Sequence, residues 1–534
     1  MEFSKPLEHR IPHLLSSAHA RRLLLLSVPA VLFLLATLSH RLYSDGTWDG
    51  VPYTRPLAEL NDKECAEGSP NISMPSQTTG RFHFVIAASK PNKHFCRALV
   101  SSTVNRYGPP VIAGWHGQGA LDAAETHLAK VRAVSYYLDN LPPTANDDLF
   151  LLLDGYDVQL QLGPDVLIDR YYKAAALEDE RVIQQLGPTL AEKVAGPLGR
   201  YIFFGADKIC WPVDFTRPAC WAVPEVPNMD SLAFGPKTDG DEAPYFRPRW
   251  LNSGTIMGPV REARAFFAAT LNIINATWDA EFPFHESDQY YMAELWGLQE
   301  TERINAQLHA DPNAAHPRGP DGAKWPTLAV GGKHNHHVAV DYGSALFQTW
   351  AGYEQFVDWR PFPEPGFGRA IHQNVRDDPR FRPWVLRLAG DAIAAIDRIF
   401  RSTDDSSMGA TSDELLARSE FGSNVVTRTV MPVYHCTGAK DALDTFYPRM
   451  WFYHHAQALV RSAVRHFKAG RAFAPRPVDG RLWYPAHPYP RAAAPDDGGA
   501  WADGSDGSGE LSWVDFASMC KEHEADVFAV EMLG

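Results

Sequence analysis

The sequence predicts an α/β fold whose doubly wound, mostly parallel sheet presents a functional site at the carboxyl ends of its strands. Three observations lead to this expectation. Short apolar runs alternate with helical segments in the order strand, helix, strand, helix, strand. Polar residues follow several of these runs directly. The 534 residues are 45% apolar and 21% charged, a composition typical of globular proteins.

The amino-terminal half of the domain should supply most of this sheet. We expect a strand at 82–89, a helix at 94–107, a strand at 111–115, a helix at 123–138 and a central strand at 149–153. A further buried strand is expected at 201–206, where Asp207 ends it, and 223–249 reads as a Pro-rich loop. In the segment that follows, Asn252, Ser253 and Gly254 predict a tight turn whose backbone can approach a ligand.

The carboxyl-terminal half is expected to continue this pattern. Helices are predicted at 261–271 and from Ser287 or Asp288 onward, with one of these two residues as the cap. Strands are predicted at 338–341, continued by 345–350, and at 429–434, where His435 follows the last strand. One helical face runs from Phe452 to Phe467. Residues 402–415 are predicted to be disordered, and 471–534 to be a Pro/Gly-rich tail with a short terminal helix.

The amino terminus carries the pattern of a signal anchor. Basic residues dominate 1–22, an uncharged apolar run occupies 23–38, and turn formers are frequent across 39–80. This predicts a cytoplasmic tail, a transmembrane anchor and a stem in front of a domain at 81–470, with a single-pass type II topology. A cleaved signal peptide is the alternative. The sequons at Asn71 and Asn275 are compatible with a lumenal domain.

Charge and cysteine content argue against nucleic-acid binding and against a structural zinc site. The formal net charge is -14 and no long basic run occurs, which argues against nucleic acid as a partner. None of the six cysteines forms a CxxC pair, so a structural zinc site is not expected. Cys210 and Cys220 are the favoured disulfide pair for an oxidising compartment, and buried free thiols are the alternative.

The central strand carries the strongest chemical signal. Five apolar residues at 149–153 are followed by Asp154 and Asp157. Two carboxylates this close repel each other unless a cation lies between them, and oxygen ligands favour Mn²⁺ or Mg²⁺. A strand end with two solvated aspartates is the alternative. For His435 the alternative is an ordinary loop or core histidine that binds no metal. The histidine-rich cluster at 334–337 is interpreted as a polar loop.

Six motifs in a fixed order carry a family resemblance. They are Asp154-Gly-Tyr156-Asp157, Phe204-Gly-Ala-Asp207 with Trp211-Pro212, Asn252-Ser-Gly254, Ser287-Asp288-Gln289, Asp341 with Phe347-Gln348, and His435 with Gly438-Ala-Lys440. With them, 82–455 resembles the glycosyltransferase domain of the collagen lysyl hydroxylases, the procollagen galactosyl- and glucosyltransferase-like family. The spacing from His435 to Lys440 is one residue shorter than is usual there, and the acidic run before Ser287 is absent.

The resemblance implies a GT-A fold and a role for each matched residue. It implies Asp154, Asp157 and His435 as ligands of Mn²⁺ or Mg²⁺, and Asp288 and Gln289 as catalytic residues near the transferred sugar. The implied nucleotide-sugar-binding residues are Ser89, Lys130, Tyr156, Asn252, Ser253, Gly254, Gly438 and Lys440. Within that set, Tyr156 would stack on uracil and Lys440 would meet the diphosphate.

The expected function follows from the same resemblance. It implies a glycosyltransferase that moves glucose or galactose from a UDP-sugar to a hydroxyl of a protein or glycan acceptor. Together with the anchor, this predicts a protein of the Golgi or endoplasmic reticulum membrane with a lumenal catalytic domain. A glycoside hydrolase and a non-catalytic carbohydrate-binding protein with a GT-A shell are the alternatives.

Overall fold

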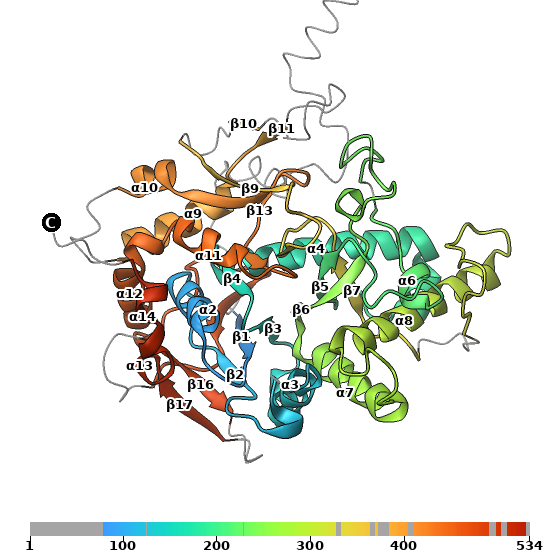
Figure 1. Ribbon diagram of the computed structural model, residues 1–534, viewed down its shortest axis with the longest axis horizontal. Coiled ribbons are helices and arrows are strands. Elements are labelled where there is room, and N and C mark those ends of the chain that lie inside the picture. Colours follow the sequence, from blue (N-terminus) through green and yellow to red (C-terminus); the bar gives the residue numbers. More distant parts are fainter. Residues whose placement is uncertain are drawn as a thin grey trace, which may run out of the picture. The chain divides into compact units, whose positions relative to one another are not determined.

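A mostly parallel sheet lies at the centre of the computed structural model, which describes residues 78–529 apart from 124, 228, 327–332, 364–368, 372–383, 404–410, 491–497 and 504–509 (Figure 1). Its strands run in the order β17(Leu511–Asp515), β16(Gly499–Asp503), β2(Val111–Ala113), β1(Thr78–Ala87), β3(Leu149–Asp154), β6(Trp250–Pro259), β5(Ile202–Asp207) and β7(Val338–Asp341), and β15(Arg481–Pro485) also pairs with β1. Strand β6 is antiparallel to both neighbours, and β17 is antiparallel to β16. The other pairs are parallel, so the predicted α/β class with a mostly parallel, Rossmann-like sheet is confirmed.

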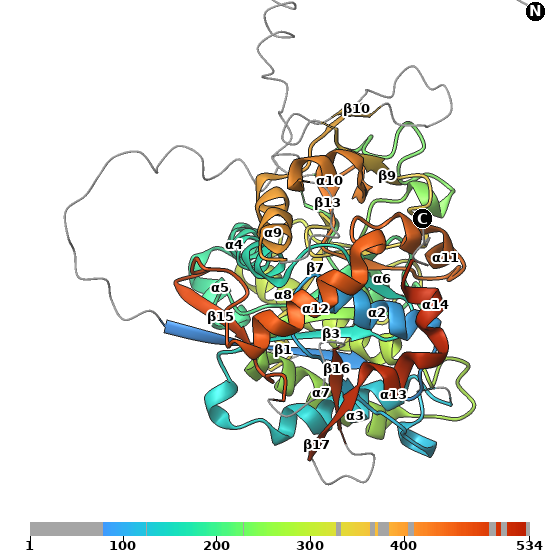
Figure 2. The ribbon, with the colours of Figure 1, turned by 90° about the vertical axis from the view of Figure 1, so that its left-hand side faces the viewer.

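Helices cover both faces of this sheet (Figure 2). Helices α3(Leu128–Asn140) and α7(Val260–Thr277) pack together on one face, and α2(Lys93–Val104) packs against α12(Ala456–Lys468) on the other. The long helices α4(Pro164–Leu186) and α8(Asp288–Ala310) complete the cover. The shorter helices are α5(Pro188–Ala195), α6(Pro218–Trp221), α9(Gly390–Arg401), α10(Ser412–Arg418), α11(Ala442–Phe446), α13(Phe516–Cys520) and α14(Glu524–Val527).

Local sequence rules account for several element boundaries. The five residues Leu149–Leu153 are each at most 1% exposed, as expected for a strand covered on both faces. Helix α8 begins where Ser287 accepts a hydrogen bond from the Tyr290 backbone amide, which confirms Ser287 as its cap. Helix α4 ends at Gly187, whose φ of 74° is in the left-handed region that glycine tolerates. Strand β7 has the bounds that the sequence predicts.

Short strands outside the central sheet replace two predicted strands. Strand β14(Val433–His435) lies between β4(Val158–Leu160) and β8(Phe347–Thr349) in a separate sheet. A second small sheet joins β13(Thr429–Val430), β12(Glu420–Asn424) and β9(Val357–Pro361), and a third pairs β10(Arg369–Ile371) with β11(Trp384–Leu386). The expectation of one strand at 429–434 is therefore wrong, as is the continuation of β7 through 345–350. Asp341 instead closes a turn by accepting the amides of Ala345, Leu346 and Phe347.

Two further predictions fail in the middle of the chain. Asn252, Ser253 and Gly254 do not form a turn, because they lie inside the continuous strand β6. The pairing of β5 with β6 shifts its register between Phe204 and Gly205, so the irregularity is a bulge in the ladder. Part of 402–415, predicted to be disordered, forms the start of α10, whose cap Thr411 makes a reciprocal capping box with Glu414. Residues 404–410 lie outside the described residues.

The predicted carboxyl-terminal tail is instead part of the folded domain. Within 471–534, β15, β16 and β17 extend the central sheet. A disulfide between Cys96 of α2 and Cys520 of α13 fastens this segment to the first helix. The short terminal helices α13 and α14 agree with the expected helical end. The sequence suggested a surface tail because the three strands are short and the segments between them are rich in proline and glycine.

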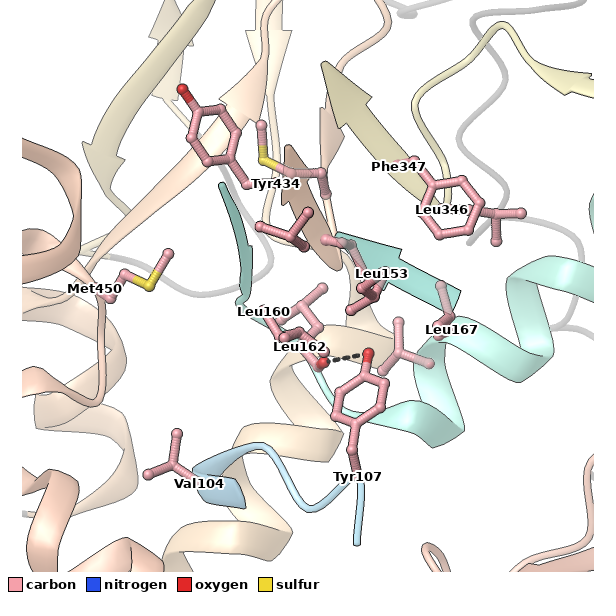
Figure 3. Packing of buried hydrophobic residues seen from close by; sticks show 14 of the residues in the cluster. Val104, Tyr107, Leu153, Leu160, Leu162, Leu167, Leu346, Phe347, Tyr434 and Met450 are labelled. Carbon is pink, nitrogen blue, oxygen red and sulfur yellow. Dashed lines mark hydrogen bonds between the residues drawn. The ribbon is translucent and has the colours of Figure 1, made fainter. Parts of the chain in front are cut away.

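The core is continuous from the central sheet to the small β4–β14–β8 sheet (Figure 3). Leu153 of β3, Leu160 of β4 and Tyr434 of β14 all belong to one buried cluster. At its base, Tyr107 donates a hydrogen bond of 3.0 Å to the carbonyl of Leu162, so the chain after α2 is tied to the chain after β4 (Figure 3). This packing fixes the position of β14 relative to the end of β3.

No helix among the described residues is long and apolar enough to cross a bilayer. The predicted anchor at 23–38, the cytoplasmic tail and the stem up to residue 77 lie outside the described residues.

Candidate metal centre

Asp154, Asp157 and His435 meet at the carboxyl end of β3. One potential ligand atom from each of the three lies within 4.8 Å of the other two. Asp154 ends β3, and Asp157 directly precedes β4. Because β14 pairs antiparallel with β4 and sets His435 opposite Val158, the histidine is brought beside Asp157. The ladder between these two short strands therefore joins residues that are far apart in the sequence.

Gly254 makes room for the imidazole of His435. A Cβ atom at Gly254 would lie 2.1 Å from Cε1 of His435 and 2.6 Å from Nε2. No side chain larger than hydrogen fits at that separation, so the backbone of β6 forms one wall against the ring. The predicted close approach of Gly254 is present, and the group that it accommodates is the histidine.

Gly438 and Lys440 lie on the loop after β14. Gly438 has a φ of 78°, which lets the loop turn back toward the site. The ammonium of Lys440 lies 3.2 Å from Oδ2 of Asp157 and is about half exposed. His435 Nε2 lies 3.2 Å from the other oxygen, Oδ1. Asp157 therefore contacts two cationic groups at once when His435 is protonated.

The charges of Asp157 and His435 depend on each other. Burial by itself would raise the pKa of Asp157, but His435 and Lys440 outweigh burial and hold that pKa well below its usual value. Burial would lower the pKa of His435, but Asp157, with Asp154 and Asp207 beyond it, raises the pKa of the imidazole. The raised pKa of His435 shows that carboxylates dominate its surroundings, and the lowered pKa of Asp157 shows that His435 and Lys440 stabilise its charge.

A buried lysine connects the triad to the start of α8. Lys130 of α3 places its ammonium 2.8 Å from Asp154 Oδ1 and 2.6 Å from Asp288 Oδ2, and it donates to the carbonyl of Ser253 at 3.0 Å. Burial would lower the pKa of Lys130, but the two carboxylates raise it above its usual value. Burial would raise the pKa of Asp288, but Lys130 outweighs burial and lowers it. Asp288 is therefore ionised at neutral pH.

Gln289 and Asn252 form an amide network beside the triad. Gln289 accepts from the Asn252 side chain at 3.3 Å and from the Ser253 amide at 3.2 Å, and it donates to Asp207 at 3.3 Å. Asn252 also donates to Asp207 at 3.0 Å. Burial raises the pKa of Asp207 to about 6, against the effect of these hydrogen bonds. Asp207, at the end of β5, is thus a member of the site and not a solvated strand end.

Tyr156 and Ser89 join the turn after β3 to the chain after β1. The Tyr156 hydroxyl accepts from the amides of Ser89 and Lys90 at 3.0 Å and 2.9 Å and donates to the Lys90 carbonyl at 3.0 Å. The Ser89 hydroxyl donates to Asp122 at 3.0 Å. These bonds attach the turn after β3 to the carboxyl end of β1 and fix the position of the phenol ring.

The triad has the donor set that a hard divalent ion requires. Oxygen from Asp154 and Asp157 with one imidazole nitrogen suits Mn²⁺ or Mg²⁺ and leaves about three positions of an octahedral shell for other ligands. Nδ1 of His435 is buried and makes no hydrogen bond. Unsatisfied polar atoms of this kind are uncommon in folded proteins and are consistent with an ion site.

Exposed apolar side chains lie on chain segments near Asp207 and Asp288. Trp211 lies on the segment after β5 and is 50% exposed, and its ring contacts Phe284, just before α8, at 5.5 Å. Most of the exposed large apolar side chains gather on three loop segments, namely Ile209, Trp211, Val213, Phe215, Leu232 and Trp278. Two of these segments adjoin Asp207 and Asp288, so this rim adjoins the site.

All thirteen predicted site residues occupy the carboxyl-end region of the sheet, and two others there were not predicted. Lys90 and Asp122 form an ion pair of 2.9 Å next to Ser89. Lys90 follows a strand end directly and could have been found by the same rule as Ser89. Asp122 comes from an irregular segment without a pattern.

No protein-family model matches the chain, and no curated protein matches it.

Proposed function

We propose that the protein is a metal-dependent glycosyltransferase of GT-A type that moves glucose or galactose from a UDP-sugar to a hydroxyl of a protein or glycan acceptor. The observation that carries this proposal is the meeting of Asp154, Asp157 and His435, with Lys440 against Asp157, at the carboxyl ends of a mostly parallel sheet. Ligands of open α/β sheets bind at this edge. The order of motifs shared with the collagen glycosyltransferases gives the sugar and nucleotide classes.

In this reaction, the acceptor oxygen forms a bond to C1 of the sugar while the bond from C1 to the diphosphate oxygen breaks. The hydroxyl proton leaves with a base or solvent, and UDP departs with the bonding electrons. A divalent ion bound by the triad would supply positive charge to the departing diphosphate. Lys440 would add a second positive charge there, and the contact of its ammonium with Oδ2 of Asp157 at 3.2 Å supports this role.

Asp288 and Gln289 have distinct roles in this proposal. Asp288 is held ionised by Lys130, and a carboxylate with a lowered pKa is a weak base. It therefore suits the stabilisation of positive charge on the sugar ring better than proton abstraction. Gln289 acts by positioning Asn252 and Ser253, since its carbonyl holds both. Lys130, Ser89 and Tyr156 would shape the nucleotide pocket.

The exposed apolar rim supports an acceptor surface at the same edge. Exposed aromatic side chains mark interaction sites more often than isolated apolar residues do. Trp211 and its neighbours lie on segments that lead into Asp207 and Asp288. An acceptor that packs on this rim would present its hydroxyl near the sugar.

A secretory location remains part of the proposal. The disulfides Cys96–Cys520 and Cys210–Cys220 favour an oxidising compartment, and Asn275 of the second sequon is exposed. With the predicted anchor at 23–38, this supports a type II protein of the Golgi or endoplasmic reticulum membrane. Protease treatment of intact microsomes tests the topology, and digestion of the domain without detergent would contradict it.

The function is tested by screening UDP-glucose, UDP-galactose and other UDP-sugars for thermal stabilisation and UDP release, each with Mn²⁺ and with chelator. We expect stabilisation that needs both metal and nucleotide sugar, because a ligand that binds only the folded state raises the melting temperature. Asp157→Ala and His435→Ala should abolish both signals, and melting temperatures without metal separate this loss from the stability that their buried contact contributes. The exposed Asp413→Ala and His454→Ala are the matched controls.

The same experiment separates the proposal from glycoside hydrolysis. Asp207, with a pKa raised to about 6, is the group that a hydrolase could use as an acid. A hydrolase would cleave a nucleotide-free glycoside with chelator present, whereas the proposed transferase would not. Binding of a UDP-sugar without any turnover would instead indicate a non-catalytic protein.

A further inference from the structure

A cavity of about 480 Å³ opens at the opposite end of the sheet from the metal centre. It lies between the chain after α2, helix α9, the loop after α12 and strand β15. Leu482 of β15 pairs with Thr79 of β1, whereas Asp154 pairs with Ala87. The two places are thus eight residues apart along β1, or about 26 Å at the usual rise per residue of a strand. The cavity is a separate site.

Arginines dominate the charge of this cavity. Arg106, Arg398 and Arg471 line it, and Asp165 is the one carboxylate among its lining residues. Asp165 is already paired with Arg398. Among the described residues, no carboxylate makes an ion pair with Arg106 or Arg471. The cavity therefore carries a net positive charge in a chain whose overall charge is -14.

Arg106 is buried and bonded to neutral groups only. It is 5% exposed and has a φ of 64°, in the left-handed region. Its guanidinium donates to Nδ1 of His466 at 2.9 Å, to the Ser402 hydroxyl at 2.6 Å and to the Ser462 hydroxyl at 3.1 Å. Its Nε–H has no acceptor. A buried charge without a counter-charge is unfavourable unless an anion or a polar ligand compensates it.

His466 cannot add to or balance this charge. Its Nδ1 accepts from Arg106, so its Nε2 must carry the proton that it donates to the Ala472 carbonyl at 2.8 Å. This arrangement fixes the neutral tautomer. Burial, followed by the charge of Arg106, lowers the pKa of His466 to about 4. Burial, followed by Arg471 and Arg398, lowers the pKa of Arg106 to about 10, as expected where like charges face each other without an anion.

Apolar side chains form a large part of the remaining cavity wall. Phe473, Pro475 and Leu482 line it together with the ring of Tyr484. A volume of this size is in the range that small-molecule sites occupy and exceeds that of a bare phosphate ion. The wall thus offers a charged end for an oxyanion and an apolar side for the body that carries it.

We propose that this cavity binds a small phosphate or sulfate ester, with the oxyanion between Arg398 and Arg471 above Arg106 and the organic body against Phe473 and Tyr484. Arginine suits this role because its planar fork presents two donors to an oxyanion. The site does not use the metal triad, and so this proposal is independent of the proposed transferase activity.

The test measures the melting temperature of the whole domain during titration with inorganic phosphate, glucose 6-phosphate and glucose, at constant ionic strength set with chloride. Glucose 6-phosphate should stabilise the protein by a few degrees, more than inorganic phosphate at equal concentration, and glucose should have no effect. Equal effects of phosphate and its ester would overturn the role of the apolar wall. Stabilisation no greater than that by chloride would overturn the site.

Variants assign the effect to the cavity. Arg471→Glu should weaken the affinity for glucose 6-phosphate at least tenfold, because the exposed Arg471 can be reversed in charge without loss of buried contacts. Lys521→Glu, at another exposed position, changes the net charge equally and should leave affinity unchanged. Arg398→Gln, which also frees Asp165 to repel the ester, should weaken binding more than Arg471→Glu. Equal losses in Arg471→Glu and Lys521→Glu would show a non-specific charge effect and refute the proposal. Asp157→Ala should bind the ester normally.

Discussion

Two buried cations, Lys130 and Arg106, lie at opposite ends of the sheet and are compensated in opposite ways. Lys130 contacts two carboxylates, Asp154 and Asp288, and its pKa is raised despite burial. Arg106 contacts hydroxyls and an imidazole, and its pKa is lowered to about 10 because burial has no opposing carboxylate.

The difference shows what each end of the sheet can accept. At the carboxyl end, negative charge is in excess and is only partly neutralised by Lys130 and Lys440, so the site can bind a further cation. At the amino end, positive charge is in excess, so that cavity can take up an anion. The protein, whose net charge is -14, thus has an excess of negative charge at one end of β1 and an excess of positive charge at the other.

The largest effect is expected from removing Lys130. Lys130→Met leaves the buried Asp288 and the partly exposed Asp154 without their cation. Breaking a buried pair costs about 3–5 kcal/mol of unfolding free energy. Arg106→Met removes a charge that has no carboxylate partner, and so it should cost less, about 1–2 kcal/mol for the lost hydrogen bonds. Denaturant titration without metal compares the two, and equal costs would break the comparison.

The second prediction concerns the wall of the metal centre. Gly254→Ala places a Cβ where the His435 ring lies, so the imidazole must move and Mn²⁺ affinity should fall about 10- to 100-fold. Gly390→Ala is the control, because its Cβ would meet no atom within 4 Å. Calorimetric titration with Mn²⁺ measures both variants. Normal metal affinity in Gly254→Ala would remove His435 from the ligand set.

The third prediction is a pH dependence of metal binding. Asp157 raises the pKa of His435 above its ordinary value, so the metal-free imidazole stays protonated up to a higher pH than a free histidine would. Metal binding must displace that proton, and affinity should fall about tenfold for each pH unit below the pKa of His435. Measuring Mn²⁺ affinity between pH 8 and pH 6 tests this. An unchanged affinity would mean that His435 is not a ligand or is neutral throughout.

The smallest effect is expected at Lys440. Its ammonium is about half exposed, so solvent screens its contact with a diphosphate, and the loss should be about 1 kcal/mol or roughly fivefold in affinity. Lys440→Ala should weaken UDP-sugar binding and leave uridine binding unchanged, with Lys521→Ala as the control at an exposed lysine. Titration of both ligands gives the ratio. The same loss for uridine would place Lys440 away from the diphosphate.

The sequence by itself determined the features that local rules govern. The apolar run at 149–153 specified a buried strand, Ser287 specified the start of α8, and the polar residues after strands specified the edge where a site would form. Asp154 and Asp157 were identified in this way, whereas Lys130 and Asp288 were identified only through the order of motifs. These rules act over a few residues, so they can be read without knowing the fold.

Only the tertiary structure decided which strands pair. His435 reaches Asp157 because β14 pairs with β4 outside the central sheet, not because both end parallel strands of one sheet. Short buried strands look alike in sequence whatever their partner or direction, which is why β6, β14 and the strands of 471–534 were misassigned. The arginine cavity was not foreseen for the same reason. Arg106, Arg398 and Arg471 are far apart in the chain, and the charge that they share exists only after α2, α9 and α12 have packed together.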